Sequence, residues 1–499
     1  MLLFCLYILG LPLALLIARG FYNVFLHPLR RYPGPLLCRA SFLPLTLQHC
    51  RGDSNKHIQA LHRKYGPVVR VEPNLLSYAD SRAWSDIYGH RRTEDKARPR
   101  GALPKAYFGV RKNLNGVSDI LNAPTDSDHR RMRKVMNHMF APSAIASEEP
   151  LVQRYVDKMI ARLRERASRS EEVDMLMWYN YTTFDLLGSL AFDQDFGCLE
   201  SGELHPWVAN VFRSIKDSFL QRTLSRFPRP LDRLAHRYWT DSALVQARKA
   251  EFSFAVASAK KRLARGVDEG KHDFMSYMLK HNDEKGLSEG EIISNSSILI
   301  IAGSETSAAY LSGVTWCLMM NPAIMEKLTS LIRSTFATDS EITSTSLAQI
   351  EYLTAVLKEG GRLYPPLPTG QPRQVTEGGC FIAGEMVPEG SIVFVHAMGA
   401  SMAPFNFADP DRFVPERWLR EPPAPYGDDN LEASMPFALG PRSCIGQSLA
   451  WVEIRLILAR LLWNFDLALA PEQTRWIQNQ KAFQVWEKGP LKVRLTERK

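Results

Sequence analysis

The sequence predicts a mainly helical α+β fold with small β-sheets, preceded by an apolar N-terminal segment. Two long apolar stretches, one starting near Ser288 and one over residues 447–462, are typical of buried helices. Two short β-rich runs separated by Pro73 and Asn74 indicate a small sheet. With 45% hydrophobic residues and 10 Trp among 499 residues, the chain can bury a large core.

Residues 1–18 carry no charge and just reach the length of a membrane-spanning helix. A cleaved signal peptide is the alternative, but the stretch lacks a basic start and a small-residue cleavage site. Arg19, Arg30 and Arg31 follow, so the positive-inside rule places the rest of the chain on the cytosolic side. We therefore expect a retained single-pass transmembrane anchor over residues 1–18.

A proline-rich linker is predicted over residues 19–36, where Pro28, Pro33 and Pro35 favour a stiff, non-helical segment. The remaining residues, 37–499, are long enough for about three average domains or for one large domain. Seven cysteines form no CxxC pair, which argues against a disulfide framework or a structural zinc site and suits a reducing compartment.

The charge balance bears on partners. The chain has 62 Lys and Arg against 53 Asp and Glu, a net charge of +9, which suits an acidic protein partner or an anionic membrane surface. No concentrated basic tract is present, so we expect no nucleic-acid partner.

An irregular stretch over residues 101–124, rich in Gly, Asn and Pro, has the length of a functional loop. The basic helix that follows places His129 and Arg133 on one face, four residues apart.

The long apolar helix contains the run AGSET, residues 302–306. Gly303 costs about 1 kcal/mol relative to alanine inside a helix, which suggests a specific use. Thr306 can donate to a carbonyl one turn back, and Glu305 adds a carboxylate beside it. The run predicts a local kink with a groove large enough for dioxygen; a simple core threonine is the alternative.

Glu359 and Arg362 share a helix face and can form a charge-assisted pair. Such pairs are mostly exposed and contribute little, so this spacing alone is weak evidence. Gly360 and Gly361 between them should weaken the helix, and the sequence offers no physical reason for them.

One cysteine, Cys444, lies in a glycine-bracketed loop directly before the second apolar helix. It could be a thiolate ligand to haem iron, with the glycines keeping the backbone clear of a flat macrocycle; a buried structural cysteine is the alternative. Arg442 can pair with a haem propionate, and Phe437 can pack near the ring. The helix that begins near Gly446 would direct its N-terminal dipole at the sulfur and stabilise the thiolate.

The run F-x-x-G-x-R-x-C-x-G is the haem-binding signature of the cytochrome P450 superfamily. Phe437, Gly440, Arg442, Cys444 and Gly446 match every fixed position. The chain thus resembles haem-thiolate monooxygenases, and its sequence is most similar to those of membrane-bound fungal members. The resemblance implies the cytochrome P450 fold over residues 37–499, a haem-binding catalytic domain, with haem b whose iron is held by the Cys444 thiolate.

The same resemblance implies roles for further residues. Gly303, Glu305 and Thr306 would bind dioxygen and relay protons. The haem propionates would be held by Arg442, Arg373, Arg133 and His129, which stands where the family usually has Trp. Glu359, Arg362 and Arg417 would form a structural network that holds the cysteine loop. Residues 367–370 and 481–486 would line the substrate pocket.

As a function, the resemblance implies hydroxylation or epoxidation of a bulky apolar small molecule, a fungal terpenoid, polyketide or alkaloid. Electrons would come from NADPH through NADPH-cytochrome P450 reductase, at the endoplasmic reticulum membrane. Isomerisation, dehydration, desaturation and oxidative coupling are alternative reactions, and a non-catalytic haem-binding or lipid-binding protein is an alternative class.

Overall fold

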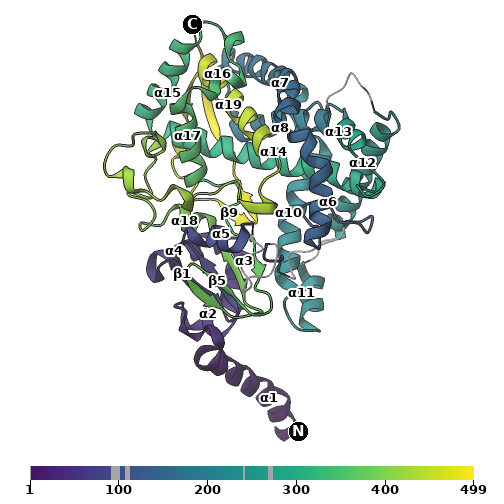
Figure 1. Ribbon diagram of the computed structural model, residues 1–499, viewed down its shortest axis with the longest axis vertical. Coiled ribbons are helices and arrows are strands. Elements are labelled where there is room, and N and C mark those ends of the chain that lie inside the picture. Colours follow the sequence, from purple (N-terminus) through teal and green to yellow (C-terminus); the bar gives the residue numbers. More distant parts are fainter. Residues whose placement is uncertain (1, 91–101, 107–112, 240–241, 268–272, 499) are drawn as a thin grey trace.

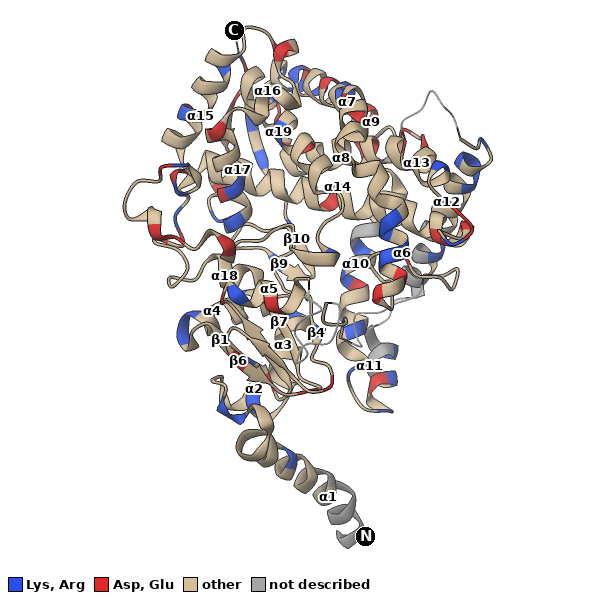
Figure 2. Cartoon of the chain, viewed as in Figure 1, with Lys and Arg blue, Asp and Glu red and all other residues tan. Residues whose placement is uncertain are grey.

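The computed structural model describes residues 2–90, 102–106, 113–239, 242–267 and 273–498. Helices form a broad body, the largest sheet lies at its lower end, and helix α1 extends away from that end (Figure 1). Charged residues lie mainly on the outer helices, whereas few lie along the central helix α14 (Figure 2). The predicted mainly helical fold with small sheets is confirmed.

The N-terminal region is more helical than the sequence suggested. Helix α1 (Leu2–Phe21) runs into a π-helical turn η1 (Tyr22–Leu26), and the 3-10 turn η2 (Pro28–Arg31) follows. The expectation of a non-helical segment around Pro28, Pro33 and Pro35 was therefore wrong at residues 28–31, and the linker bounds 19–36 stay a prediction. Pro28 occupies the first position of η2, where a helix needs no N–H and where the fixed φ of proline fits.

The described side chains of α1, among them Leu13, Leu15 and Ile17, are exposed. Nowhere in the described part of the chain is a helix both long and apolar enough to cross a membrane. The transmembrane anchor over residues 1–18 stays a prediction.

The largest sheet has the order β1-β2-β7-β4. Strands β1 (Val68–Glu72) and β2 (Leu75–Tyr78) pair antiparallel, which confirms the two predicted runs. β2 then pairs in parallel with β7 (Ile392–Val395), and β4 (Arg373–Gln374) pairs antiparallel with β7. This sheet thereby joins segments about 300 residues apart in the chain. The other strands are β3 (Glu172–Asp174), β5 (Cys380–Ile382), β6 (Glu385–Val387), β8 (Phe465–Leu469), β9 (Lys481–Phe483), β10 (Val485–Glu487) and β11 (Lys492–Glu497).

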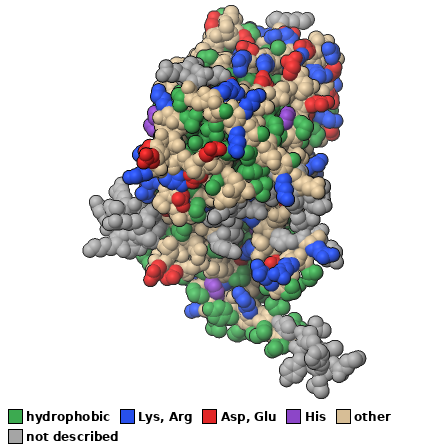
Figure 3. Space-filling view, turned by 90° about the vertical axis from the view of Figure 1, so that its right-hand side faces the viewer, with side chains coloured by type: hydrophobic (Ala, Val, Ile, Leu, Met, Phe, Trp, Pro, Cys, Tyr) green, Lys and Arg blue, Asp and Glu red, His purple; other side chains and the backbone are tan. Residues whose placement is uncertain are grey.

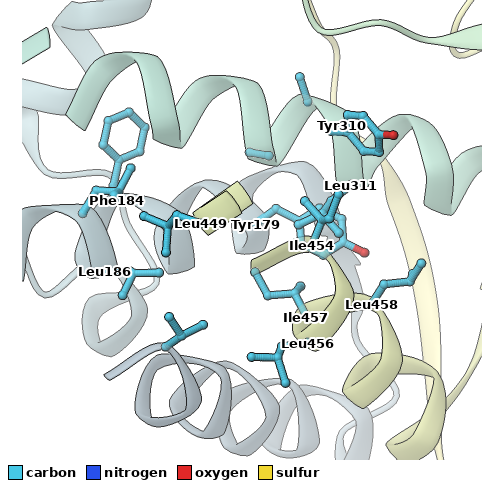
Figure 4. Packing of buried hydrophobic residues seen from close by; sticks show 14 of the residues in the cluster. Tyr179, Phe184, Leu186, Tyr310, Leu311, Leu449, Ile454, Leu456, Ile457 and Leu458 are labelled. Carbon is cyan, nitrogen blue, oxygen red and sulfur yellow. The ribbon is translucent and has the colours of Figure 1, made fainter. Parts of the chain in front are cut away.

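Two long helices dominate the core. α14 (Glu289–Met319) begins at a capping box formed by Ser288 and Glu291, and α19 (Gln447–Asn464) follows the cysteine loop. Their buried side chains meet those of α8 (Met175–Phe192), as Figure 4 shows. Both helices were predicted from their apolar runs, and both predictions are confirmed.

The remaining helices surround this core. They are α2 (Leu36–Ala40), α3 (Leu43–Arg51), α4 (Ser54–Tyr65), α5 (Arg82–Tyr88), α6 (Asp126–Met136), η4 (Asn137–Phe140), α7 (Pro142–Ser168), α9 (Cys198–Ser201), α10 (Pro206–Leu224), α11 (Leu231–Trp239), α12 (Ser242–Leu263), α13 (Phe274–Lys280), α15 (Pro322–Thr335), η5 (Asp339–Glu341), α16 (Ser344–Ala348), α17 (Glu351–Leu363), α18 (Ala397–Ser401), η6 (Pro415–Trp418), η7 (Tyr426–Asp428), η8 (Leu431–Ala433), η9 (Gly440–Arg442) and η10 (Pro471–Gln473).

The two glycines of α17 allow this helix to approach α14 closely. A Cβ at Gly360 would collide with the side chain of Val314, and one at Gly361 would collide with the Tyr310 ring. The Tyr310 hydroxyl donates a 2.7 Å hydrogen bond to the Leu357 carbonyl across the same contact. The close contact supplies the reason for the glycines that the sequence alone did not.

We expect Gly360→Ala to lower the free energy of unfolding by about 1–3 kcal/mol, because the added methyl overpacks the contact with Val314. Gly290→Ala is the matched control, because a Cβ there meets only ordinary contacts and alanine favours the helix by up to about 1 kcal/mol. Urea unfolding followed by circular dichroism measures both. Equal gains in the two variants would show that helix propensity outweighs packing at Gly360.

Candidate active site

The cysteine loop is held in a fixed conformation before α19 begins. Gly440 has a φ of +78°, and a Cβ there would collide with the Tyr88 carbonyl, so glycine is required on both counts. The Cys444 N–H donates a 2.9 Å hydrogen bond to the Phe437 carbonyl. Gly446 forms the N-cap of α19, as expected from the apolar run that follows it.

Cys444 differs from the other described cysteines in its surroundings. Its side chain is exposed only to an internal cavity, deep within the protein, whereas Cys38, Cys198, Cys317 and Cys380 are packed against other side chains. Burial raises the pKa of the Cys444 thiol, while the Gly446 N–H and the charge of Arg133 lower it. A metal ion bound there would deprotonate the thiol outright.

The cavity beside Cys444 has a volume of about 260 Å³ and lies between α14 and the cysteine loop. Ala302, Gly303 and Thr306 line it from α14, and Phe437 lines it from the loop. Phe437 also stacks on Tyr310, with ring centroids 6.4 Å apart. The structure therefore brings together two motifs that lie more than 130 residues apart in the sequence.

Two arginines near the cavity keep buried donors without partners in the described part of the chain. The Arg442 Nε and Nη2 atoms bind Asp126 Oδ1 at 3.3 and 3.0 Å, but its Nη1 has no partner. Arg373 is 2% exposed, and its Nε likewise has no partner. Because unpaired buried donors are costly, they suit the carboxylates of haem propionates, and the residues present fit this cofactor.

His129 also lines this cavity and is buried. Burial and the charges of Arg442, Arg133 and Lys105 lower the pKa of His129 to about 3, so its imidazole is neutral and keeps one N–H donor. Arg133, from the same helix, donates to the Ser443 carbonyl at 2.6 Å and to the Pro441 carbonyl at 3.1 Å. Arg133 thus braces the cysteine loop, and its role toward a propionate stays a prediction.

Lys105 was missed by the sequence analysis, which identified only the loop over residues 101–124. Residues 101 and 107–112 of that loop lie outside the described residues. Burial, followed by the charges of Arg442 and Arg373, lowers the pKa of Lys105 to about 7. Its amino group lines the same cavity as Arg442, and the repulsion between these cations favours the neutral form of the amine. A single lysine in an irregular stretch gives no sequence signal for this position.

On α14, the Thr306 hydroxyl donates a 2.6 Å hydrogen bond to the Ala302 carbonyl, as predicted. The helix stays α-helical through Gly303, where a Cβ would collide with Leu187 of α8. Close helix packing thus accounts for this glycine. Glu305 is buried, is not among the described residues that line the cavity, and forms an ion pair with Lys488.

Glu453 is a second carboxylate that the sequence analysis missed. It lines the cavity from α19 and accepts a 2.8 Å hydrogen bond from the Ser307 hydroxyl of α14. Burial raises the pKa of Glu453 to about 7. The signal was available, because Glu453 is the one acidic residue in the apolar stretch over residues 447–464.

Glu359, Arg362 and Arg417 form a fully buried network, with side chains 0% exposed. Arg362 Nε and Nη2 each donate to Glu359 at 2.8 Å, and Arg417 Nε donates at 3.2 Å. The remaining donors of Arg362 bind the carbonyls of residues 401, 410 and 412. The network ties α17 to the segment that leads to the cysteine loop.

A second cavity of about 210 Å³ lies beside the first and shares part of its lining. Leu367 borders both cavities, and Gly370 and Gln484 border the second. All three belong to the segments 367–370 and 481–486 that the sequence analysis expected near a substrate. Side chains of α3, α4, α10, β2 and β7 also line it.

Comparison with known proteins covers almost the whole chain. Residues 33–495 match the family model described as Cytochrome P450. The cytochrome P450 monooxygenase aclL of Aspergillus oryzae is 42% identical over 482 residues, 96% of this chain and 95% of the relative. The cytochrome P450 monooxygenase olcB of Penicillium canescens is 40% identical over 490 residues, 96% of each. The trichothecene C-4 hydroxylase of Trichoderma arundinaceum is 39% identical over 498 residues, 98% of this chain and 97% of the relative.

We expect Glu359→Gln to destabilise the protein by about 3–5 kcal/mol, because it leaves the buried Arg362 without a counter-charge and Arg417 with Asp429 alone. Glu416→Gln is the control: Glu416 pairs with the exposed Lys327, and its loss should change the free energy of unfolding by about 1 kcal/mol or less. Urea unfolding and haem content per protein measure the effect. A stable, haem-replete Glu359→Gln protein would contradict the structural role of the network.

Proposed function

The chain belongs to the cytochrome P450 family and is a cytochrome P450 monooxygenase; from this premise we propose that it hydroxylates or epoxidises a bulky apolar secondary metabolite. The family implies a haem held by a cysteine thiolate and electrons supplied by a reductase. The observation that carries the proposal is the position of Cys444, whose side chain opens into a cavity with Thr306 on the opposite wall.

Each cofactor-binding residue has a definite part in this proposal. Cys444 would hold the haem iron through its thiolate, and Phe437 would pack beside the macrocycle, while Gly440 and Gly446 shape the loop. The Arg442 and Arg373 donors that lack a partner among the described residues would bind the propionates, with His129 and Arg133 in support. When bound, the thiolate-ligated haem supplies the chemistry that splits dioxygen and inserts one oxygen atom into the substrate.

Protons for this reaction come from residues of α14. The Thr306 hydroxyl lines the cavity and can turn its proton from the Ala302 carbonyl toward the cavity interior. Glu305 lies one residue earlier and can return a proton to Thr306. Gly303 lets α14 pack closely on α8, which sets the distance of Thr306 from the opposite wall.

The walls of the two cavities support an apolar substrate. Their lining is mainly hydrophobic, including Ile120, Leu121, Phe274, Leu299 and Leu367. The related hydroxylase from Trichoderma arundinaceum is named for a trichothecene, and other relatives are named only as monooxygenases. We propose a fungal terpenoid, polyketide or alkaloid as the substrate class.

We further propose that residues 1–18 anchor the enzyme in the endoplasmic reticulum membrane, with the catalytic domain in the cytosol. The uncharged sequence of this stretch and the position of α1 outside the body support the proposal. Exposed hydrophobic side chains continue along α2 and α3, at Leu36, Leu37, Leu43 and Leu47. Figure 3 shows hydrophobic side chains gathered at the lower end of the molecule. NADPH-cytochrome P450 reductase is the proposed electron donor, and the net charge of +9 suits an acidic partner.

The test is the absorption spectrum of the purified, reduced protein under carbon monoxide. We expect the strongly red-shifted Soret band of thiolate-ligated haem, because Cys444 is the proposed ligand. The band should be lost in Cys444→Ala and kept in Cys50→Ala, a control at a half-buried cysteine of α3. A band at the shorter wavelength of imidazole-ligated haem, or a protein without haem, would contradict the proposal.

A further inference from the structure

The charged side chains that line the second cavity, of about 210 Å³, are all basic. Arg222 and Arg226 of α10 line this cavity and do not line the one that contains Cys444, whereas Lys105 borders both. Among the described residues that line the second cavity none is acidic, whereas Glu453 lines the first. The part of the second cavity formed by α10 therefore differs in charge from the part next to the cysteine loop.

The two arginines of α10 are held in different ways. Arg226 binds both carboxylate oxygens of Glu72 in β1, with Nη1 at 2.8 Å from Oε1, so its charge is balanced by this pair. The Arg222 Nε donates to the Ser218 carbonyl at 3.2 Å, and its Nη2 donates to Gln484 Oε1. Both of these oxygens are neutral, so the two contacts orient the Arg222 guanidinium and leave its positive charge at the cavity wall.

Gln484 holds its side chain in this place at the expense of a strained backbone. It is the single residue between the paired positions Phe483 and Val485 at the tip of the β9–β10 hairpin, and its φ is +76°. A positive φ is uncommon for residues other than glycine, and such strained positions cluster where ligands bind. Glycine would relieve the strain but would lose the amide oxygen that binds Arg222. The hairpin tip is thus built to orient a cation in the cavity.

The titratable neighbours show the effect of positive charge in this space. His49 of α3 lines the same cavity, and burial followed by the charge of Arg226 lowers the pKa of His49 to about 3. Burial and the nearby arginines lower the pKa of Lys105 to about 7. Both groups therefore favour their neutral forms, as expected in a buried space with positive surroundings. An anion bound there would offset this potential.

The rest of the wall is apolar. Leucine, isoleucine and phenylalanine side chains of α3, α4, β2, α10 and β7 line it, namely Leu45, Ile58, Leu75, Phe219 and Phe394. A ligand that fills this cavity must therefore be apolar over most of its surface and carry its polar group where Arg222 lies.

We propose that the substrate is an apolar molecule with one carboxylate group, and that Arg222, oriented by Gln484, binds this carboxylate. The inference rests on the proposed function and narrows its substrate class to acids. A guanidinium group binds a carboxylate through charge-assisted hydrogen bonds, which are stronger than neutral ones. The apolar body of the substrate then extends past Leu121 and Leu367, which border both cavities, toward Cys444. The carbon that is oxidised is therefore at the end of the molecule away from the carboxylate.

Isothermal titration calorimetry of the full-length holoenzyme tests the preference for an acid. The ligands are octanoic, dodecanoic and abietic acids, each compared with its primary amide, which has nearly the same size and no charge. At about pH 8 the acids are ionised. We expect at least one acid to bind about tenfold to a hundredfold more tightly than its amide, because hydrogen bonds to charged groups contribute more. A result in which no acid is preferred over its amide would overturn the inference.

Two variants test the site with the same ligands. Arg222→Gln removes the charge, and Gln484→Glu keeps the shape of the side chain but places an anion beside Arg222. We expect both to lose the preference for the acid and to bind the amide within about twofold of the wild type. Arg213→Gln is the matched control, because Arg213 is exposed on the same helix and is not among the described residues that line either cavity. It should keep the preference.

The remaining outcomes separate this inference from the proposed function. If Arg222→Gln weakens the binding of acid and amide equally, Arg222 only braces the hairpin, and the carboxylate site is wrong. If the preference survives in both variants, Arg222 is not the group that binds the acid. In either case a red-shifted carbon monoxide band in the wild type and the variants leaves the monooxygenase proposal standing. Absence of that band from the wild type would contradict the proposed function itself.

Discussion

The buried carboxylate of Glu359 is the interaction on which the geometry of the site depends. A charge with no solvent exposure is tolerated only when its oxygens are fully paired, and here two arginines, the Val414 N–H and the Trp418 indole N–H bind it. The other N–H groups of Arg362 donate hydrogen bonds to the backbone carbonyls of residues 401, 410 and 412. The segment before the cysteine loop has little regular secondary structure, so its conformation is fixed by this network instead of by backbone hydrogen bonds.

Helix α17, which carries Glu359, also packs against α14, the helix that forms the other wall of the cavity. Gly360 and Gly361 bring α17 close to α14, and the Tyr310 hydroxyl binds α17 at Leu357. α14 in turn presents Thr306 to the cavity. The cysteine loop and α14 are thus both held in place by contacts with the short helix α17. The distance between them is set by packing that has no room for an added methyl group.

The elements that could be predicted from the sequence are those encoded by one continuous run of residues. The buried helices α14 and α19, the β1–β2 pair and the cysteine loop each follow from a short run of residues, and the structure has all of them. The helical turn at Pro28 was missed because proline favours both an extended segment and the first turn of a helix. Lys105 and Lys488 were missed because their meaning depends on distant partners: Lys488 meets Glu305 across 183 positions of the chain. The glycines of α17 are explained only by the neighbours that they touch.

The charges around the cavity are unequally satisfied, and this inequality links the fold to its cofactor. The acids Glu305 and Glu453 each have a partner in the chain, Lys488 and Ser307 respectively. The cationic end is different: Arg442 and Arg373 keep buried donors without partners among the described residues, and burial together with Arg442 lowers the pKa of Arg373 to about 10. A dianionic cofactor would pair these donors and remove the mutual repulsion of the cations. Because such a ligand binds the folded chain alone, part of the stability of this end of the molecule belongs to the cofactor rather than to the polypeptide.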